Sequence, residues 1–267
     1  MTYEEYDAIG GINATAIKAG RRSMLAMHHE MTRTDDDPTP AMIRGTQLHL
    51  CVLDTERFSR QVVMWDGGDR RGKDWTEFKA ENEGRTILKP KEHAELMAVS
   101  NAVHANPHAH QLVQATEHEK VFVVDDPVMG PLKCRVDGVN YTQLLEFKTT
   151  NSPTRAAFLK NAYGLAYELQ LATYWKLCQM DMGVDLQVNV VVAQQAAPFD
   201  VWVYRVPDAI LKDAWKECLR IIMLYRACQQ SNWYPGEQDM VEDYSLPAWA
   251  GVQEEDISTG TMEVSDL

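Results

Sequence analysis

The chain has 267 residues and is 45% hydrophobic, enough to bury a substantial core in one domain, and its five scattered cysteines form no Cys-x-x-Cys pair that would indicate a zinc ribbon. Its formal net charge of -13 argues against a protein that is basic throughout, although nine of the acidic residues, and no Lys or Arg, lie between Ala227 and Leu267. No apolar run approaches the length of a bilayer span and the N-terminus resembles no signal peptide, so we expect a cytoplasmic protein that does not bind membranes.

Two helices are expected in the first 54 residues. Asn13 and Thr15 are suitable N-caps for a helix from about Ala14 to Met31. An exposed linker, Thr32 to Pro40, separates it from a second helix, Ala41 to Asp54, which places His49 among apolar residues. A lone histidine at such a position is most often a core or boundary residue.

The segment from Phe58 to Pro90 is polar and aperiodic, so we expect it to be irregular. It contains a basic run around a tryptophan, namely Arg70, Arg71, Lys73 and Trp75. Basic residues beside a Trp can bind phosphates and stack on an unpaired base. The more common alternative is a solvated loop with the Trp packed beneath it.

Lys91 to Val113 is expected to be helical, with a break near Asn106-Pro107. Three histidines lie in this segment, at positions 104, 108 and 110. We reject a metal site there, because the expected break leaves no ligand pair at i, i+4 spacing on an intact helix.

Three strands are expected next. Lys120 to Val124 is a strand with Glu119 at its entrance. Leu132 to Val139 and Gln143 to Thr149 form a β-hairpin, because a short polar turn separates two runs of strand character.

The hairpin brings charged groups together in an apolar setting. Glu146 and Lys148 are two positions apart and point to the same face, which Asp137 on the neighbouring strand can reach. Buried charges must pair or bind a metal, and converging carboxylates suit a hard divalent cation such as Mg²⁺. A lysine beside such a cation can orient a water and stabilise charge on a phosphoryl oxygen, which favours phosphodiester hydrolysis. A surface ladder of Glu and Lys is the alternative.

The remaining elements alternate helix and strand. A helix opens at Ser152-Pro153 and runs to Met180, bent at Gly164. Strands follow at Leu186 to Ala193 and at Val201 to Val206. The last helix, Pro207 to Gln229, has an inner stripe made of Ile210, Leu211, Trp215, Leu219, Ile222 and Tyr225.

This order of elements predicts an α/β fold with a mixed central sheet flanked by helices. We expect a single domain over residues 1–233, with a helical elaboration at its N-terminus. We expect residues 234–267 to form an acidic, flexible tail, within which Tyr244 to Trp249 is a candidate docking segment.

Asp137 followed by Glu146-Phe147-Lys148 resembles the PD-(D/E)XK nuclease signature, with Val136 in place of the proline. Further pieces narrow the resemblance to exonucleases of the RecE type (exodeoxyribonuclease VIII-like) from phages and prophages: Gly45 to His49, Arg71 to Trp75, and Tyr167 to Gln170 with Tyr174. The resemblance implies a core like that of the restriction endonucleases.

The resemblance also assigns roles to single residues. It implies a metal held by His49, Asp137, Glu146 and the backbone carbonyl of Phe147, with Glu119 as a secondary candidate. Lys148 would position or activate the attacking water, and Gln170 and Tyr174, four residues apart on one helix face, would hold the phosphate or the water. The metal that we expect is Mg²⁺, and a histidine ligand suggests that Mn²⁺ would also work.

The implied activity is digestion of linear double-stranded DNA from 5′ to 3′, which leaves a 3′ overhang for a phage single-strand annealing protein. The implied assembly is a ring-shaped homo-oligomer around DNA. Two alternatives stay open: a non-catalytic module that binds DNA ends or proteins, and a nuclease like RecB or Cas4. Members of the last group with an iron-sulfur cluster need four cysteines at spacings that this chain lacks.

Overall fold

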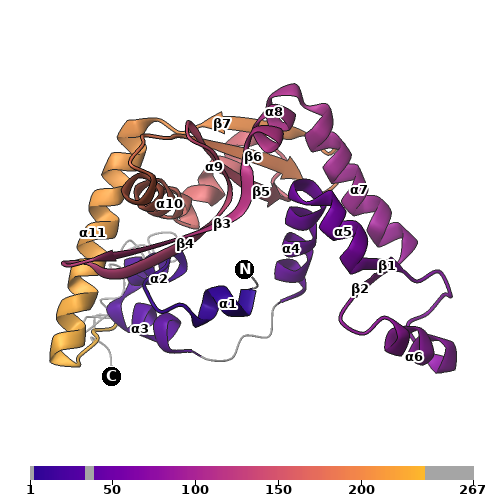
Figure 1. Ribbon diagram of the computed structural model, residues 1–267, viewed down its shortest axis with the longest axis horizontal. Coiled ribbons are helices and arrows are strands. Elements are labelled where there is room, and N and C mark those ends of the chain that lie inside the picture. The colour runs from indigo at the N-terminus through magenta and orange to yellow at the C-terminus, as the bar shows by residue number, and fades with distance from the viewer. Residues whose placement is uncertain (1–2, 34–38, 238–267) are drawn as a thin grey trace, which may run out of the picture.

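A mixed five-stranded sheet lies at the centre of the computed structural model, which describes residues 3–33 and 39–237 (Figure 1). The strand order is β3-β4-β5-β6-β7, with bounds Glu117–Asp126, Gly130–Val139, Gln143–Thr150, Gln187–Gln194 and Val201–Arg205. β5 and β6 run parallel, and the other neighbouring strands run antiparallel. The predicted mixed sheet flanked by helices is confirmed.

Helices cover both faces of the sheet. Successive side chains of β5 point to opposite sides, so neighbouring residues of this strand pack on different faces. Leu144 packs in an apolar cluster with α10 (Tyr167–Met182) and α11 (Asp208–Ser231). Leu145 packs in a second cluster with α4 (Pro40–Leu53), on the other face. This double cover explains why β6 is almost continuously apolar.

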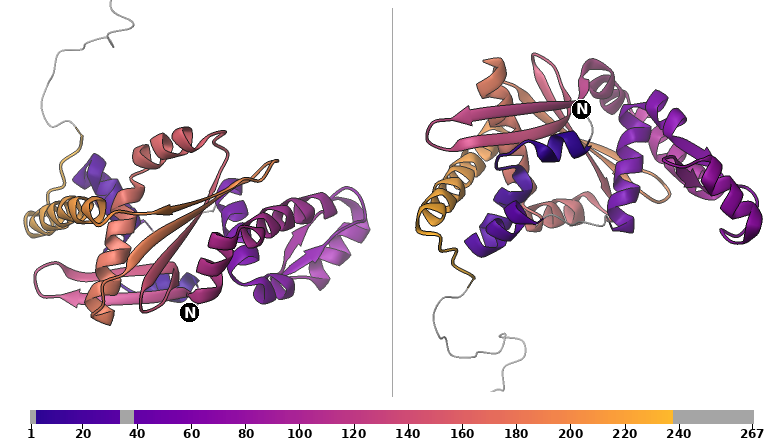
Figure 2. Two further views of the ribbon diagram at one scale, coloured as in Figure 1. Left: turned by 90° about the horizontal axis from the view of Figure 1, so that it is seen from above. Right: turned by 60° about the horizontal axis from the view of Figure 1, so that its bottom comes forward.

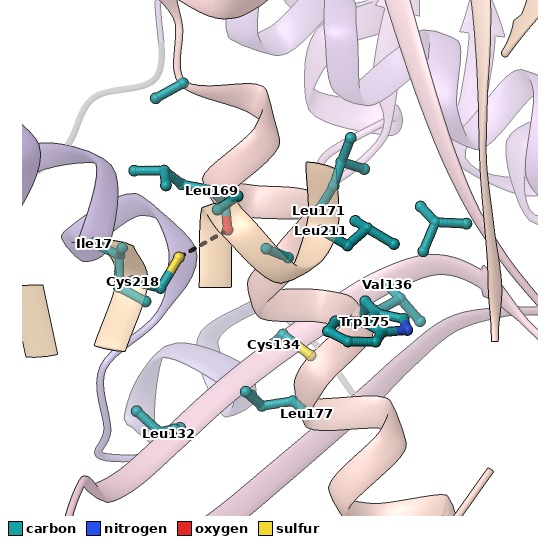
Figure 3. Close-up of a cluster of buried hydrophobic side chains, with 14 of the residues drawn as sticks. Ile17, Leu132, Cys134, Val136, Leu169, Leu171, Trp175, Leu177, Leu211 and Cys218 are labelled. Atoms are coloured by element: carbon teal, nitrogen blue, oxygen red, sulfur yellow. Dashed lines mark hydrogen bonds between the residues drawn. The ribbon is translucent and has the colours of Figure 1, made fainter. Parts of the chain in front are cut away.

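α10 is buried on nearly all sides, since it lies between the sheet and α11. Figure 3 shows Cys134 of β4 beside Trp175 and Leu177 of this helix. The Cys218 thiol of α11 donates to the Leu169 carbonyl at 3.5 Å (Figure 3). The helix that carries Gln170 and Tyr174 is therefore held firmly against the strands.

The single helix expected from Ser152 to Met180 is wrong. Two helices, α9 (Arg155–Gly164) and α10, are separated at Ala166, whose left-handed backbone (φ 53°) redirects the chain. Thr154 caps α9 by accepting a hydrogen bond from the Ala157 amide at 3.2 Å, so the cap lies two residues later than expected.

The single helix expected from Ala14 to Met31 is also two helices, α2 (Ala14–Arg22) and α3 (Met24–Thr32). Of the two predicted caps, Asn13 caps α2, and Thr15 lies inside the helix. Ser23 ends α2 in an extended conformation and caps α3 with its hydroxyl, a break that the apolar periodicity does not reveal.

A short helix, α1 (Tyr3–Ala8), precedes these two. Of the linker expected from Thr32 to Pro40, residues 34–38 lie outside the described part of the chain. Thr39 caps α4, whose first residue is Pro40.

The region expected to be irregular, Phe58 to Pro90, is largely ordered into short elements. These are α5 (Thr55–Gln61), β1 (Val62–Met64), α6 (Gly72–Glu81) and β2 (Thr86–Leu88), with β1 and β2 paired in parallel. Strands of three residues are too short to show a period in the sequence. Figures 1 and 2 show this region at the end of the molecule remote from α11.

The expected helix break at Asn106-Pro107 is confirmed. α7 (Pro90–Ala105) ends there and α8 (Pro107–Ala115) begins, and the Asn106 side chain caps α8.

The inner stripe of α11 differs in part from the prediction. Leu211, Ile222 and Tyr225 are buried as expected, but Ile210 is 48% exposed and Leu219 is 38% exposed. Ala214, Cys218 and Ile221 are buried in addition to the predicted residues.

Residues 238–267, which include Tyr244 to Trp249 and most of the expected acidic tail, lie outside the described residues. The domain boundary at residue 233 stays a prediction. Among the helices that the structure describes, none combines the length and the apolar character needed to cross a membrane.

Candidate active site

The two strands of the hairpin separate soon after their turn. β4 and β5 pair only at Gly138 with Leu145 and at Val139 with Leu144, whereas β5 pairs with β6 along its whole length. Beyond those two pairs β4 and β5 form no further ladder pair. Asp137 stands at the point where the strands diverge.

Glu146 and Lys148 lie on the face of β5 that is covered by α10. The Lys148 ammonium donates to Glu146 Oε1 at 2.5 Å. The Gln170 amide donates to the same carboxylate oxygen at 2.8 Å and to the Tyr174 hydroxyl at 3.1 Å. The structure therefore brings Glu146, Lys148, Gln170 and Tyr174 into one buried hydrogen-bond network.

Asp137 links this network to α4. Its Oδ2 accepts a hydrogen bond from the Phe147 amide at 2.7 Å, and its Oδ1 lies 3.2 Å from His49 Nδ1. The edge of the His49 ring packs against the Phe147 ring, with 5.1 Å between centroids. These contacts fix the Asp137 carboxylate in the gap between the two strands.

Glu119 is placed beside this pair by a local distortion of β3. The register between β3 and β4 is the same before and after Glu119, which places Glu119 opposite Asp137. These two residues nevertheless do not form a ladder pair. Glu119 has φ 55°, which is rare for a residue other than glycine and typical of functional sites. Its carboxylate also pairs with Arg135 at 3.0 Å.

Among the described residues, His49, Glu119 and Asp137 form the one group of three or more ligand-type side chains whose donor atoms all lie within 4.8 Å of one another. Two carboxylates and an imidazole suit Mg²⁺ or Mn²⁺. In addition, Glu146 Oε2 is buried without a hydrogen-bond partner among the described residues. An ionised carboxylate oxygen in that state fits a cation that it can face.

Burial and like charge raise the pKa of Glu146 to about 7, although Lys148 opposes the shift. Burial also acts on Asp137, but the charges of His49 and Lys148 and the Phe147 amide outweigh it and lower the pKa of Asp137. The pKa values of the two carboxyl groups are therefore shifted in opposite directions, as in sites where one group must bind a cation or exchange a proton.

Burial disfavours a charge on His49 and on Lys148, yet in each case neighbouring carboxylates prevail. Asp137 raises the pKa of His49, and Glu146 with Asp137 raises the pKa of Lys148. Burial, followed by the charge of Glu146, raises the pKa of Tyr174 well above its usual value. Lys148 is therefore an ammonium at neutral pH and Tyr174 is a neutral phenol.

The Phe147 carbonyl has a suitable direction for the role that the sequence predicts. In an extended strand the amide N–H and the carbonyl of one residue face the same neighbour. Because the Phe147 amide donates to Asp137, its carbonyl also faces the gap beside β4. Its role as a ligand stays a prediction.

The structure does not bring the predicted DNA-binding residues to this site. They lie around α6, and each makes a local contact: Arg70 with Glu92 at 2.5 Å, Arg71 with Asp69 at 2.8 Å, Lys73 with Glu77 at 3.5 Å, and Trp75 with the Trp65 ring at 5.6 Å between centroids. Figure 1 shows α6 far from the sheet. Their DNA role stays a prediction.

Lys18 lies near the network of Glu146, Lys148, Gln170 and Tyr174, and the sequence did not identify it as a site residue. Lys18 of α2 lies 5.9 Å from the Tyr167 ring centroid, and Lys148 lies 4.8 Å from the same centroid. Nothing in the local pattern of α2 identifies Lys18, because only the packing of α2 against α10 brings it there.

We expect Mg²⁺ to raise the melting temperature of the protein more at about pH 8 than at about pH 6. A Glu146 carboxyl with a pKa near 7, and an imidazole with a raised pKa, must release protons when a cation binds. Without the cation, Glu146 takes up a proton more readily in the folded protein than in the unfolded chain, because its pKa is raised. The resulting contribution to stability is fully present below the pKa of Glu146 in the unfolded chain and is lost as the pH rises through about 7. Circular dichroism melts with and without Mg²⁺ at both pH values provide the measurement.

Glu146→Gln is the control for this prediction, since it removes one of the two titrating groups and should reduce the difference between the two pH values. Equal Mg²⁺-induced shifts at both pH values in the unaltered protein would contradict the assignment of Glu146 to the cation.

A family model described as a PDDEXK-like domain of unknown function (DUF3799) matches residues 16–244. Among solved structures, a "Putative exonuclease" from Eubacterium rectale has a TM-score of 0.64 at 12% identity, over 97% of this chain and 98% of that chain. LHK-Exo in complex with dAMP has a TM-score of 0.43 at 15% identity, over 86% of this chain and 98% of that chain. No curated protein matches the sequence. At such identities, the first of these two structures supports the fold alone.

Proposed function

The chain belongs to the family of PDDEXK-like domains of unknown function, DUF3799, and from this premise we propose that it is a metal-dependent deoxyribonuclease. One observation carries the proposal: a cluster of His49, Glu119 and Asp137 adjoins a buried Glu146–Lys148 pair across a gap between two strands. A structural ion pair alone would not explain the second carboxylate and the imidazole gathered beside it.

We assign the cation to Asp137, Glu146 and His49, with Glu119 and the Phe147 carbonyl as further ligands. A bound Mg²⁺ would polarise a phosphoryl oxygen and neutralise its charge. Holding these carboxylates at one place without a cation is unfavourable, as the raised pKa of Glu146 shows.

The groups around Lys148 would act on the water and the phosphate. Because its pKa is raised, Lys148 acts as an ammonium that orients the attacking water and stabilises charge on the phosphoryl oxygens, and it does not act as the base in this state. The Gln170 amide donates to Glu146 and to the Tyr174 hydroxyl and so holds both in place. Gln170 and the neutral Tyr174 hydroxyl would also offer hydrogen bonds to the phosphate or the water.

The finer assignment is an exonuclease of the RecE type, which digests linear duplex DNA from 5′ to 3′ and leaves a 3′ overhang for a phage-type annealing protein. It rests on the motif resemblance in Gly45 to His49 and Tyr167 to Gln170. The ring-shaped homo-oligomer and the use of Mn²⁺ rest on the same resemblance. Against an iron-sulfur nuclease, the chain lacks four cysteines at the spacings that such a cluster needs.

The test is incubation of the protein with a linear duplex and with a closed circular plasmid of the same sequence. We expect Mg²⁺ to support degradation of the linear DNA, and EDTA to abolish it, because the site needs its cation. We expect the circle to survive, because an exonuclease needs an end. A duplex labelled at one 5′ end, sampled over time on a gel, reports the polarity.

Cleavage of both substrates at equal rates would remove the exonuclease assignment and leave the nuclease chemistry standing. Binding of linear DNA without any degradation in Mg²⁺ or Mn²⁺ would contradict the nuclease proposal and favour a module that binds DNA ends.

A further inference from the structure

Two lysines from different parts of the chain meet at the ring of Tyr167. Lys148 of β5 lies 4.8 Å from the ring centroid, and Lys18 of α2 lies 5.9 Å from it. Tyr167 is the first residue of α10, one turn before Gln170. The position of Lys18 is therefore fixed next to the catalytic network, although Lys18 takes no part in its hydrogen bonds.

The ammonium of Lys18 has no ion pair or hydrogen bond among the residues that the structure describes. The carboxylates close enough to affect it already have other cations. Glu146 pairs with Lys148 at 2.5 Å, and Glu30 pairs with Arg33 at 2.8 Å. Burial and then the charge of Lys148 lower the pKa of Lys18, although the charges of Glu146 and Glu30 oppose the shift.

A groove of about 380 Å³ begins at Tyr167 and runs past the end of β5. Its lining includes the polar residues Asn151, Ser152, Asn161 and Gln195 and the aromatic ring of Phe158. A volume of this size suits a small-molecule ligand such as one nucleotide. The mixture of amides, hydroxyls and aromatic rings suits a base and a sugar.

We propose that Lys18 and Tyr167 form a second phosphate subsite, which binds the DNA strand one or more nucleotides away from the scissile phosphate and directs the adjoining nucleoside into the groove. The inference rests on the proposed nuclease function, because Lys18 and the proposed catalytic Lys148 both lie over the ring of Tyr167. The subsite supplies strand binding and no chemistry, so Lys18 is a positioning residue.

The test compares Lys18→Gln, Lys18→Arg and the control Lys212→Gln. Lys212 is an exposed lysine of α11 that pairs with Asp208, on the outer side of the fold. Cleavage of a linear duplex is followed at increasing concentration and at several salt concentrations. Binding of a short fluorescent single-stranded oligonucleotide is measured separately in EDTA, so that it does not depend on turnover.

We expect Lys18→Gln to raise KM about 10- to 100-fold, since one hydrogen bond to a charged phosphate is lost, and to change kcat little. The slope of log Kd for the oligonucleotide against log salt should become shallower by about 0.7. Lys18→Arg should restore binding, because a guanidinium also binds phosphate. Lys212→Gln should leave all these values unchanged.

Unchanged KM and oligonucleotide affinity in Lys18→Gln would overturn the subsite and leave the nuclease function intact. A loss of kcat that Lys18→Arg does not restore, with unchanged affinity, would also overturn it, because it would indicate a structural role for Lys18. If the unaltered protein bound the oligonucleotide but cleaved nothing, the nuclease function would fail, and the EDTA binding data would still decide on Lys18.

Discussion

Lys148→Ala is expected to fold and to lose hydrolysis of a linear duplex, with a kcat about 10²- to 10⁴-fold below that of the unaltered protein. The ammonium is placed by Glu146 at 2.5 Å and by the Tyr167 ring, and its raised pKa keeps it charged where a phosphoryl oxygen would gain charge. Single-turnover cleavage of an end-labelled duplex in Mg²⁺ provides the measurement.

The change leaves Glu146 without its cationic partner, so the fold must be examined separately. A carboxyl with a pKa near 7 can take up a proton and remain buried as a neutral acid, which limits the loss of stability. Circular dichroism melts of Lys148→Ala and of the polar variant Lys148→Gln provide this control, with Lys216→Ala on the exposed side of α11 as the matched lysine. Full activity in a folded Lys148→Ala protein would refute the site.

Asp137→Asn is expected to lose cation binding and, with it, about 10³-fold or more in kcat. The substitution keeps the shape of the side chain and an oxygen that can accept from the Phe147 amide, so it tests the charge and not the packing. The remaining ligands would bind a divalent cation poorly, because one of the hard anionic oxygens is gone. Isothermal titration with Mn²⁺, alongside cleavage assays, provides the measurement.

The same variant has an effect on its neighbours that can be checked. The charge of Asp137 helps to raise the pKa of Glu146 and of His49, so both pKa values should fall in Asp137→Asn. Asp213→Asn, an exposed carboxylate of α11, is the matched control and should leave cation binding unchanged. Cation affinity of Asp137→Asn equal to that of the control would contradict the role of Asp137 as a ligand.

The hairpin and its charged residues are predictable from the sequence because their determinants are local. Strand alternation alone puts Glu146 and Lys148 on one face, and the structure shows them in direct contact. Likewise, a spacing of four residues predicts that Gln170 and Tyr174 share a helix face, and they form a hydrogen bond.

Other features depend on packing between distant segments and could not be read from local patterns. Glu119 reaches Asp137 only through a left-handed residue inside a strand, which strand propensity does not foresee. The position of Lys18 depends on how α2 packs against α10. On α11, where apolar residues are too abundant for the period to select one face, Ile210 and Leu219 are exposed.

The breaks inside the expected long helices have a different cause. Ser23 and Ala166 end helices that the apolar pattern would continue. The Ser23 side chain caps the next helix, and Ala166 adopts a left-handed backbone conformation that changes the direction of the chain. Short elements such as β1 and β2 fall below the length at which any period can be detected.

The candidate site takes its side chains from five separate elements, from His49 on α4 to Tyr174 on α10, and β5 holds its shape through β6, which comes later still. A ribosome must therefore have synthesised most of the polypeptide before any of these atoms can meet. An unfinished or truncated copy that ends before α10 would therefore carry no complete site.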